Sequence, residues 1–248
     1  MTEGVSALHP VARKPFLLIS MPWIAGAAWK LHIPEGFALG YDKDRHFGPV
    51  GSVEWHHEQD RVFYRTELTE DRHYACGLRV EARAVENGVD LFAVVENQGT
   101  IEWPAYANLL VCLSCLAGGE FFDSDATRTF VSSGERMRTV RELIGGDREP
   151  GMTHFLTPPF EDPKDQLLAG RVDDGTVVRV REDGQYSVVF WWEDANRVDT
   201  NFNPMSCIHS HPQLGPLAPG GRKERRGWIR VVQGGPEEAE RLITMKRP

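Results

Sequence analysis

The sequence predicts an all-β fold, a large antiparallel β-sandwich (supersandwich) with one or two short helices. Strand-like alternation of apolar and polar residues recurs along the chain, turn residues separate the alternating segments, and helical periodicity is scarce. Many short strands at intervals of roughly 8–15 residues are typical of a sandwich or barrel. With 248 residues, 41% of them hydrophobic, the chain can bury one sizeable core. We therefore expect a single domain over residues 1–248.

Two hairpins are the clearest elements. Residues 74–84 alternate between apolar and charged side chains, and the turn Glu86-Asn87-Gly88 leads into a second strand over 89–97. An Asn-Gly corner is a favoured hairpin turn. The second hairpin joins residues 176–182 to 185–192 through Asp183-Gly184.

Weaker patterns predict the remaining elements. Further strands are expected over residues 16–20, 51–56, 62–66, 106–116, 128–131, 205–209 and 227–232. Apolar residues at helical spacing from Met137 to Ile144 predict a short helix ended by Gly145-Gly146, and a second helix is expected from Pro236 to Thr244. Residues 145–170 show little periodicity and predict a long loop that folds over a site.

Charge and targeting signals exclude several classes. A net charge of −8 disfavours a nucleic-acid partner and an anionic membrane surface. The apolar run over 16–28 is broken by Pro22, and no segment reaches the ~20 apolar residues that a membrane span needs. We expect a soluble cytoplasmic protein. Cys112 and Cys115 have metal-site spacing, but residues three apart in a strand point to opposite faces, so we interpret them as buried thiols.

Histidines supply the first candidate site. His209 and His211 are two apart in a predicted strand and should share one face, and His56 and His57 follow another strand. If one of His56, His57 or Glu193 joined the first pair, the set could bind a divalent transition metal such as Zn, Fe, Ni or Mn. The alternative is that these are polar strand-end residues that bond to backbone and water.

Aromatic and charged residues supply a second set. Trp55 and Trp192 lie in or beside predicted strands, where an indole could stack on the apolar face of a sugar. Asp123 and Arg128 lie close together in FFDSDATR, and the guanidinium could anchor ligand hydroxyls. The alternatives are core aromatics and a turn with an exposed ion pair.

Four blocks of sequence resemble one family. They are LRVEARAVENGVDLFAVVENQGTIEWPAYANLL, FFDSDATRTFVSSG, YSVVFWWEDANRV and CIHSHPQLGPLAPGG. Their order and character resemble the galactose mutarotase-like superfamily of sugar-active and sugar-binding supersandwich domains. Aldose epimerases of that superfamily use a His as acid and a Glu as base. By the resemblance, the acid position falls in 108–113, near Cys112, where no His occurs, and the base position falls on His209. The resemblance therefore implies the fold and a sugar ligand rather than mutarotation itself.

Three functions remain open at this point. The first is a carbohydrate-recognising or carbohydrate-active protein, of an epimerase (isomerase) or lyase type, with His209, His211 and an opposing Glu193 in a cleft of the concave sheet. The second is a metal-dependent enzyme on a β-sandwich or cupin-like barrel. The third is a non-catalytic binding module. The expected partner is a small-molecule sugar or oligosaccharide, and the long strand edges leave a homodimer open.

Overall fold

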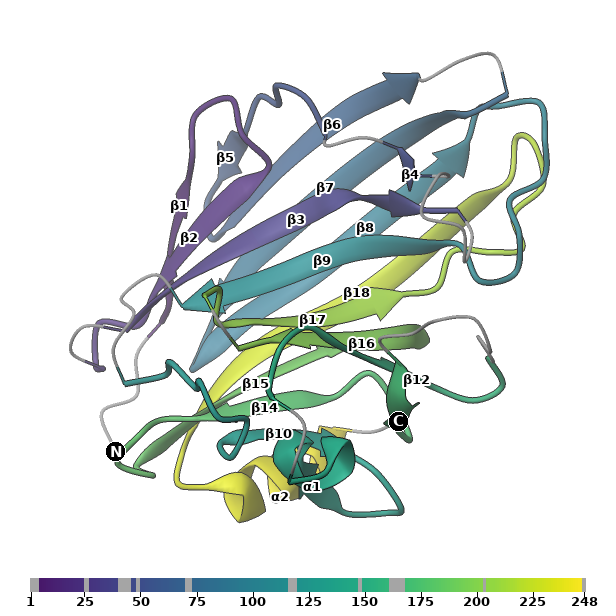
Figure 1. Ribbon diagram of the computed structural model, residues 1–248. Coiled ribbons are helices and arrows are strands. Elements are labelled where there is room, and N and C mark those ends of the chain that lie inside the picture. The colour runs from purple at the N-terminus through teal and green to yellow at the C-terminus, as the bar shows by residue number, and fades with distance from the viewer. Residues whose placement is uncertain are drawn as a thin grey trace.

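The chain folds into two sheets that lie face to face (Figure 1). The computed structural model describes residues 5–24, 27–39, 46–47, 50–69, 73–115, 120–146, 149–160, 168–202 and 204–246. The first sheet has the order β1 (Ala7–Pro10), β2 (Phe16–Ser20), β3 (Ala28–Ala38), β9 (Asn108–Cys115), β17 (Cys207–Pro212), β16 (Ala195–Asn201), β12 (Thr153–Leu156) and β13 (Leu168–Arg171), with β4 (His46–Phe47) paired to β3.

The second sheet combines early and late segments of the chain. Its order is β11 (Met137–Thr139), β10 (Thr129–Ser132), β14 (Val177–Val180), β15 (Tyr186–Trp192), β18 (Arg222–Gln233), β8 (Gly88–Asn97), β7 (Ala75–Val85), β6 (Arg61–Thr69) and β5 (His56–Glu58). Among the strands described, β12 and β13 form the parallel pair and the others pair antiparallel. The predicted all-β, mainly antiparallel sandwich is therefore confirmed.

The core lies between the sheets and follows from the alternation. In the first sheet, Leu31, Leu113 and Ile208 face each other across β3, β9 and β17, and all three are buried. In the second sheet, β15 turns Phe190 and Trp192 into the same core. Strand β17 packs across the sandwich on β14 and β15. The residues between those core positions in the first sheet must point away from the second sheet.

Both predicted hairpins are present. In the β7–β8 hairpin Asn87 takes a φ of 55°, and in the β14–β15 hairpin Gly184 takes a φ of 71°. Asn and Gly are the residue types that reach this left-handed region at least cost. Alternation on β7 is also as predicted, because the apolar positions from Leu78 onward face the core and the charged ones face outward.

Two helices accompany the sheets. Helix α1 (Val140–Ile144) begins at Thr139, whose hydroxyl accepts the backbone N–H of Glu142 in a capping box. Met137, expected in this helix, belongs instead to β11, because the cap at Thr139 fixes a later start. Helix α2 (Pro236–Lys246) packs Ala239 and Ile243 against the outer side of β14 and β15, at the bottom of the view in Figure 1.

Four sequence expectations are corrected. Residues 51–55 are not a strand, and β5 begins at His56. The expected loop over 145–170 contains β12, and strands β3 and β16 lie in segments for which no strand was predicted. These three strands are central to the site described below. In the part of the chain that the structure describes, no helix is long and apolar enough to cross a membrane.

Candidate functional site

A row of polar residues runs across the outer face of the first sheet. Strand register places His32 (β3) opposite Cys112 (β9), Cys112 opposite His209 (β17), His209 opposite Asp199 (β16), and Asp199 opposite His154 (β12). Residues directly opposite one another in paired strands lie on the same face. Because their neighbours along each strand face the core, these five side chains, here called the histidine row, face away from the second sheet.

A bulge in β3 brings a carboxylate to the row. Pairing between β3 and β9 is interrupted between His32 and Gly36. Glu35 lies in this interruption, with Oε1 3.4 Å from His32 Nδ1 and Oε2 4.0 Å from His209 Nε2. Burial raises the pKa of Glu35, but the hydrogen bond with His32 and the charges of the nearby histidines outweigh it and lower the pKa overall.

Asp199 is the centre of a buried polar network. Its Oδ1 accepts a 2.7 Å hydrogen bond from Arg197 Nε, and its Oδ2 lies 3.0 Å from His211 Nε2. Arg197 also reaches His154, with Nη2 2.8 Å from Nε2. Burial alone would raise the pKa of Asp199, but Arg197 and His211 hold it well below its usual value. The carboxylate therefore stays ionised although it is almost inaccessible to water.

Hydrogen bonds fix how His209 and His211 carry their protons. His211 Nδ1 accepts the backbone N–H of Val111 at 3.1 Å, so Nε2 is the nitrogen that donates to Asp199. His209 Nδ1 lies 3.2 Å from the carbonyl oxygen of Asp199, which can only accept, so Nδ1 carries the hydrogen. Burial, helped by nearby His211, lowers the pKa of His209 to about 4. His209 is therefore neutral near pH 7, with a lone pair on Nε2.

A second cysteine, Cys207, lies beside Cys112 of the row. Ligand atoms of Cys112, Cys207 and His209 all lie within 4.8 Å of one another, and all three residues are buried. Cys112 hydrogen-bonds to Cys207 and lowers the pKa of that thiol to about 7, although burial acts in the opposite direction. The same contact, together with burial, raises the pKa of Cys112. Cys207 is thus the cysteine of the pair that becomes a thiolate near neutral pH.

The structure brings two of the predicted site residues together. His209 and His211 share the outer face of β17 with ring centroids 5.6 Å apart. Glu193, predicted to oppose them, follows the end of β15, and its carboxylate accepts the backbone N–H of Arg226 at 3.3 Å. The carboxylates that do face these histidines are Asp199 and Glu35.

His56 and His57 are not brought to this row. Both are exposed on β5 at the edge of the second sheet, and His56 stacks on Phe63 with centroids 5.3 Å apart. Trp55 also lies at this edge. Its indole N–H donates to the carbonyl of Lys14 at 2.8 Å, and its ring packs edge-on against Tyr64.

The remaining predicted residues support the fold. Trp192 is fully buried in the core. Asp123 is also buried and accepts hydrogen bonds from the Thr129 hydroxyl and the backbone N–H of Arg128. Arg128 donates to the carbonyls of Glu120, Phe122 and Val180, which ties the segment before β10 to β14. The predicted set Trp192, Asp123 and Arg128 therefore does not join the row.

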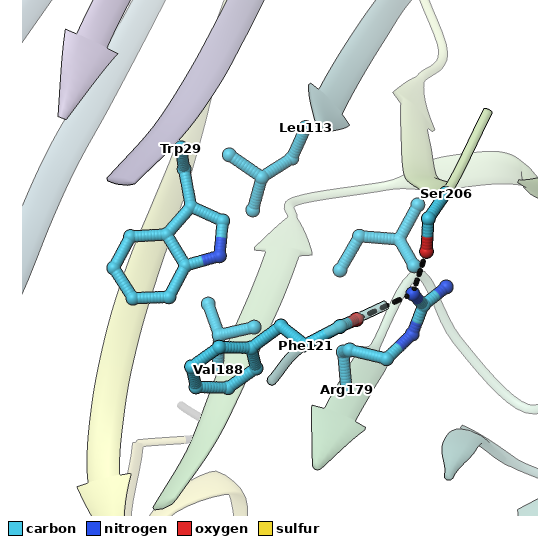
Figure 2. Close-up of a pocket in the computed structure, with 7 residues that line it drawn as sticks. Trp29, Leu113, Phe121, Arg179, Val188 and Ser206 are labelled. Atoms are coloured by element: carbon cyan, nitrogen blue, oxygen red, sulfur yellow. Dashed lines mark hydrogen bonds between the residues drawn. The ribbon is translucent and has the colours of Figure 1, made fainter. Parts of the chain in front are cut away.

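A separate small pocket lies on the core side of the first sheet. Trp29 and Leu113 form one wall, and Val188 of the second sheet lies opposite (Figure 2). Its polar residues are Arg179 and Ser206, and Arg179 donates to the carbonyl of Phe121 at 3.0 Å and to Ser206 Oγ. Since the histidine row points to the opposite side of the sheet, this pocket is not part of that site.

Sequence reasoning missed most partners of His209. His32 and Glu35 come from β3, His154 from β12, and Asp199 from β16, three strands that were not predicted. A signal was present in part, since each of these segments contains an ionisable residue between apolar or β-branched neighbours. These residues become adjacent only through the order of the strands in the first sheet, which no local sequence pattern predicts.

No family model matches the sequence, and no curated protein matches it. Solved structures do. A galactose mutarotase-like protein from Lactobacillus casei ATCC 334 has a TM-score of 0.49 at 10% identity, covering 92% of this chain and 100% of that chain. A galactose mutarotase related enzyme from Lactobacillus acidophilus has a TM-score of 0.46 at 10% identity, covering 92% and 98%.

An α-N-acetylgalactosaminidase from Bifidobacterium bifidum, in complex with GalNAc, has a TM-score of 0.54 at 14% identity. The match covers 94% of this chain and 36% of that chain, so this protein spans about a third of the enzyme. At these identities the likeness concerns the fold. With a TM-score of 0.54, the match to this enzyme shows a shared fold over 94% of the present chain.

Proposed function

We propose that this protein recognises carbohydrates through the outer face of its first sheet, around the histidine row. The observation that carries the proposal is the row itself, in which five strands in succession contribute a polar or ionisable side chain to one face. Sugar hydroxyls both donate and accept hydrogen bonds, so a sugar site needs fixed groups of both kinds. This face offers carboxylates, imidazoles and a guanidinium within a few strands of one another.

The groups that would meet a ligand are those that water can reach. The side chains of Glu35 and Arg197 are 38% and 26% exposed. Asp199 and His211 lie beneath them and are almost fully buried. In this arrangement Glu35 accepts from sugar hydroxyls and Arg197 donates to them, while Asp199 holds the guanidinium in position. Preorganised polar groups of this kind reduce the entropy cost of binding.

Protonation favours recognition over acid–base catalysis. Epimerisation of a sugar needs a protonated acid and a deprotonated base on opposite sides of one carbon. Here the pKa values of Glu35 and Asp199 are both lowered, and that of His209 is lowered to about 4. Near pH 7 these three groups are all deprotonated. The proposal therefore keeps His209 and His211 in a binding face and assigns no isomerase step to them.

The fold likeness adds a second, weaker support. The matched structure from Bifidobacterium bifidum is an α-N-acetylgalactosaminidase in complex with GalNAc, and about a third of that chain has this fold. A sugar-processing protein thus contains the same architecture. At 14% sequence identity the match supports a shared fold but not a shared binding site. The sugar itself therefore has to be identified by experiment.

A thermal-shift screen tests the proposal. Neutral aldohexoses, N-acetylhexosamines and uronic acids are added to the wild-type protein, and we expect one class to raise Tm; saturation at a hundred times Kd corresponds to about 2.7 kcal/mol. Glu35→Gln should weaken that shift because it removes the negative charge and replaces one accepting carboxylate oxygen with a donating amide. The matched control is Glu58→Gln, because Glu58 is an exposed carboxylate on β5 that pairs with Arg61. This variant should leave the sugar-dependent shift in Tm unchanged.

Two results would overturn the proposal. One is the absence of any sugar-dependent shift across the three classes. The other is an equal loss of the shift in Glu35→Gln and Glu58→Gln, which would place the binding elsewhere. Polarimetry on the stabilising sugar separates recognition from turnover, and we expect no accelerated mutarotation.

A further inference from the structure

We infer that Cys112, Cys207 and His209, with Glu35 as the fourth ligand, form a binding site for one divalent transition metal ion of the zinc type. This set differs from the one expected from the sequence, since His56 and His57 lie on the second sheet. The inference rests on the cysteine pair and does not depend on the ligand being a sugar.

The positions of the donors fit such an ion. The ligand atoms of Cys112, Cys207 and His209 lie within 4.8 Å of one another. Tetrahedral zinc, with Zn–S of about 2.3 Å and Zn–N of about 2.0 Å, holds its donors about 3.5–3.8 Å apart. The three side chains therefore have to close by about 1 Å, which small side-chain rotations provide. Adjacent strands hold them, because His209 is directly opposite Cys112 and Cys207 is opposite Ser114. A sheet is a rigid support for a site of this kind.

The chemistry of the donors fits as well. Metal ligation needs thiolate sulfur and neutral imidazole. Cys112 and Cys207 supply two sulfurs, and Nε2 of His209 offers a lone pair because Nδ1 holds its hydrogen toward the carbonyl of Asp199. The other ring nitrogen of His209 faces the carbonyl of Asp199 at 3.2 Å. A backbone carbonyl that holds the second nitrogen of a ligating histidine is a recurrent feature of metal sites, because it fixes the ring and its tautomer.

Glu35 is the proposed fourth ligand, and it lies where the metal ion would enter from solvent. Its carboxylate lies 4.0 Å from His209 Nε2, and the side chain is 38% exposed while the other three residues are buried. A set of two sulfurs, one imidazole and one carboxylate suits Zn²⁺ or Co²⁺ and excludes Mg²⁺ and Ca²⁺, which require oxygen ligands.

A cobalt titration tests the inference directly. Protein purified without an affinity tag is stripped with a chelator, kept under a non-thiol reductant and titrated with Co²⁺ in the absence of sugar. We expect one equivalent to bind with a thiolate-to-cobalt charge-transfer band and intense visible bands of a tetrahedral site, and Zn²⁺ to displace it. Absence of a charge-transfer band in the wild-type protein would overturn the inference without recourse to any variant.

Variants assign the ligands. Loss of a residue that only hydrogen-bonds to a metal ligand typically weakens metal binding 10–100-fold. Cys207→Ser removes a ligand itself and should weaken metal binding by more than this. Glu35→Gln, at a half-buried position outside the core, should weaken metal binding by a smaller factor than Cys207→Ser and keep the charge-transfer band, because both sulfurs remain. Cys76→Ala is the matched control, because Cys76 is a buried free thiol on β7 of the second sheet. Wild-type-like binding by Cys207→Ser, or loss of binding in Cys76→Ala, would contradict the assignment.

Discussion

The outer faces of the two sheets carry the same kinds of side chain in opposite surroundings. On the second sheet, Arg79 pairs with Glu81 at 2.8 Å and Arg83 pairs with Asp60 at 2.6 Å, all of them at least partly open to water. On the first sheet, Asp199 is buried beneath Arg197 and the histidines. Exposed pairs contribute little to stability, whereas a buried charge depends strongly on its partners.

This difference separates a solvated surface from a candidate site. Polar groups on the second sheet can exchange their partners for water, so their arrangement carries little information. Those on the first sheet are held in one geometry by hydrogen bonds that water does not replace. Burial of an ionisable network with perturbed pKa values is the feature that points to function, rather than the presence of histidines as such.

The largest expected effect comes from removing the buried charge. Asp199→Asn leaves Arg197 without its buried counter-charge and should lower the free energy of unfolding by about 3 kcal/mol or more. Glu81→Gln, the matched change on the second sheet, should cost less than about 1 kcal/mol. Urea unfolding of both variants measures the difference. Equal losses of unfolding free energy in the two variants would mean that the polar groups on the first sheet depend on their partners no more than those on the second sheet.

A smaller effect tests whether Trp192 belongs to the core. A Cβ at Gly227 would lie 2.5 Å from the Trp192 ring, so Gly227→Ala forces the indole or β18 to shift. We expect a loss of about 1–3 kcal/mol. Gly51→Ala is the control, since nothing lies within 4 Å of its added Cβ, and it should be nearly neutral. If Gly227→Ala were equally neutral, Trp192 would have free space beside it, as a ligand-stacking residue would need.

The smallest expected effect is a dependence on pH. Asp199 has its pKa lowered well below 3.8 in the folded protein, so its stabilising effect is present above about pH 4 and is lost as the pH falls further. Asp199→Asn has no carboxylate to protonate at this position. The gap in unfolding free energy between wild type and Asp199→Asn should therefore narrow below pH 4. A gap that widened on acidification would contradict an ionised Asp199.

The sequence predicted the second sheet better than the first. Strand β7 alternates between apolar and charged residues, and Asn or Gly turns join β7 to β8 and β14 to β15, so the local pattern was sufficient. Strand β3 contains Pro34 and Gly36, which disfavour a strand, and its bulge is the feature that places Glu35. Strand β12 has only four residues, and β16 is rich in Asn and Asp.

The same limits apply to the candidate site. The i, i+2 spacing of His209 and His211 was sufficient to predict that they share a face. Their partners could not be predicted, because Cys112, Asp199 and Glu35 become neighbours only through the strand order of the first sheet. Pairing His56 and His57 with them failed for the same reason, since β5 is an edge strand of the other sheet.

Histidine ring signals test the central claim most directly. In a protein with ¹⁵N-labelled histidines, the sugar that raises Tm is titrated while the ring nitrogens are followed by NMR. We expect shifts at His209 and His154, and none at His56, His57 or His73. Shifts confined to His56 and His57, with the signals of the histidine row unchanged at saturation, would show that the outer face of the first sheet is not where the ligand binds.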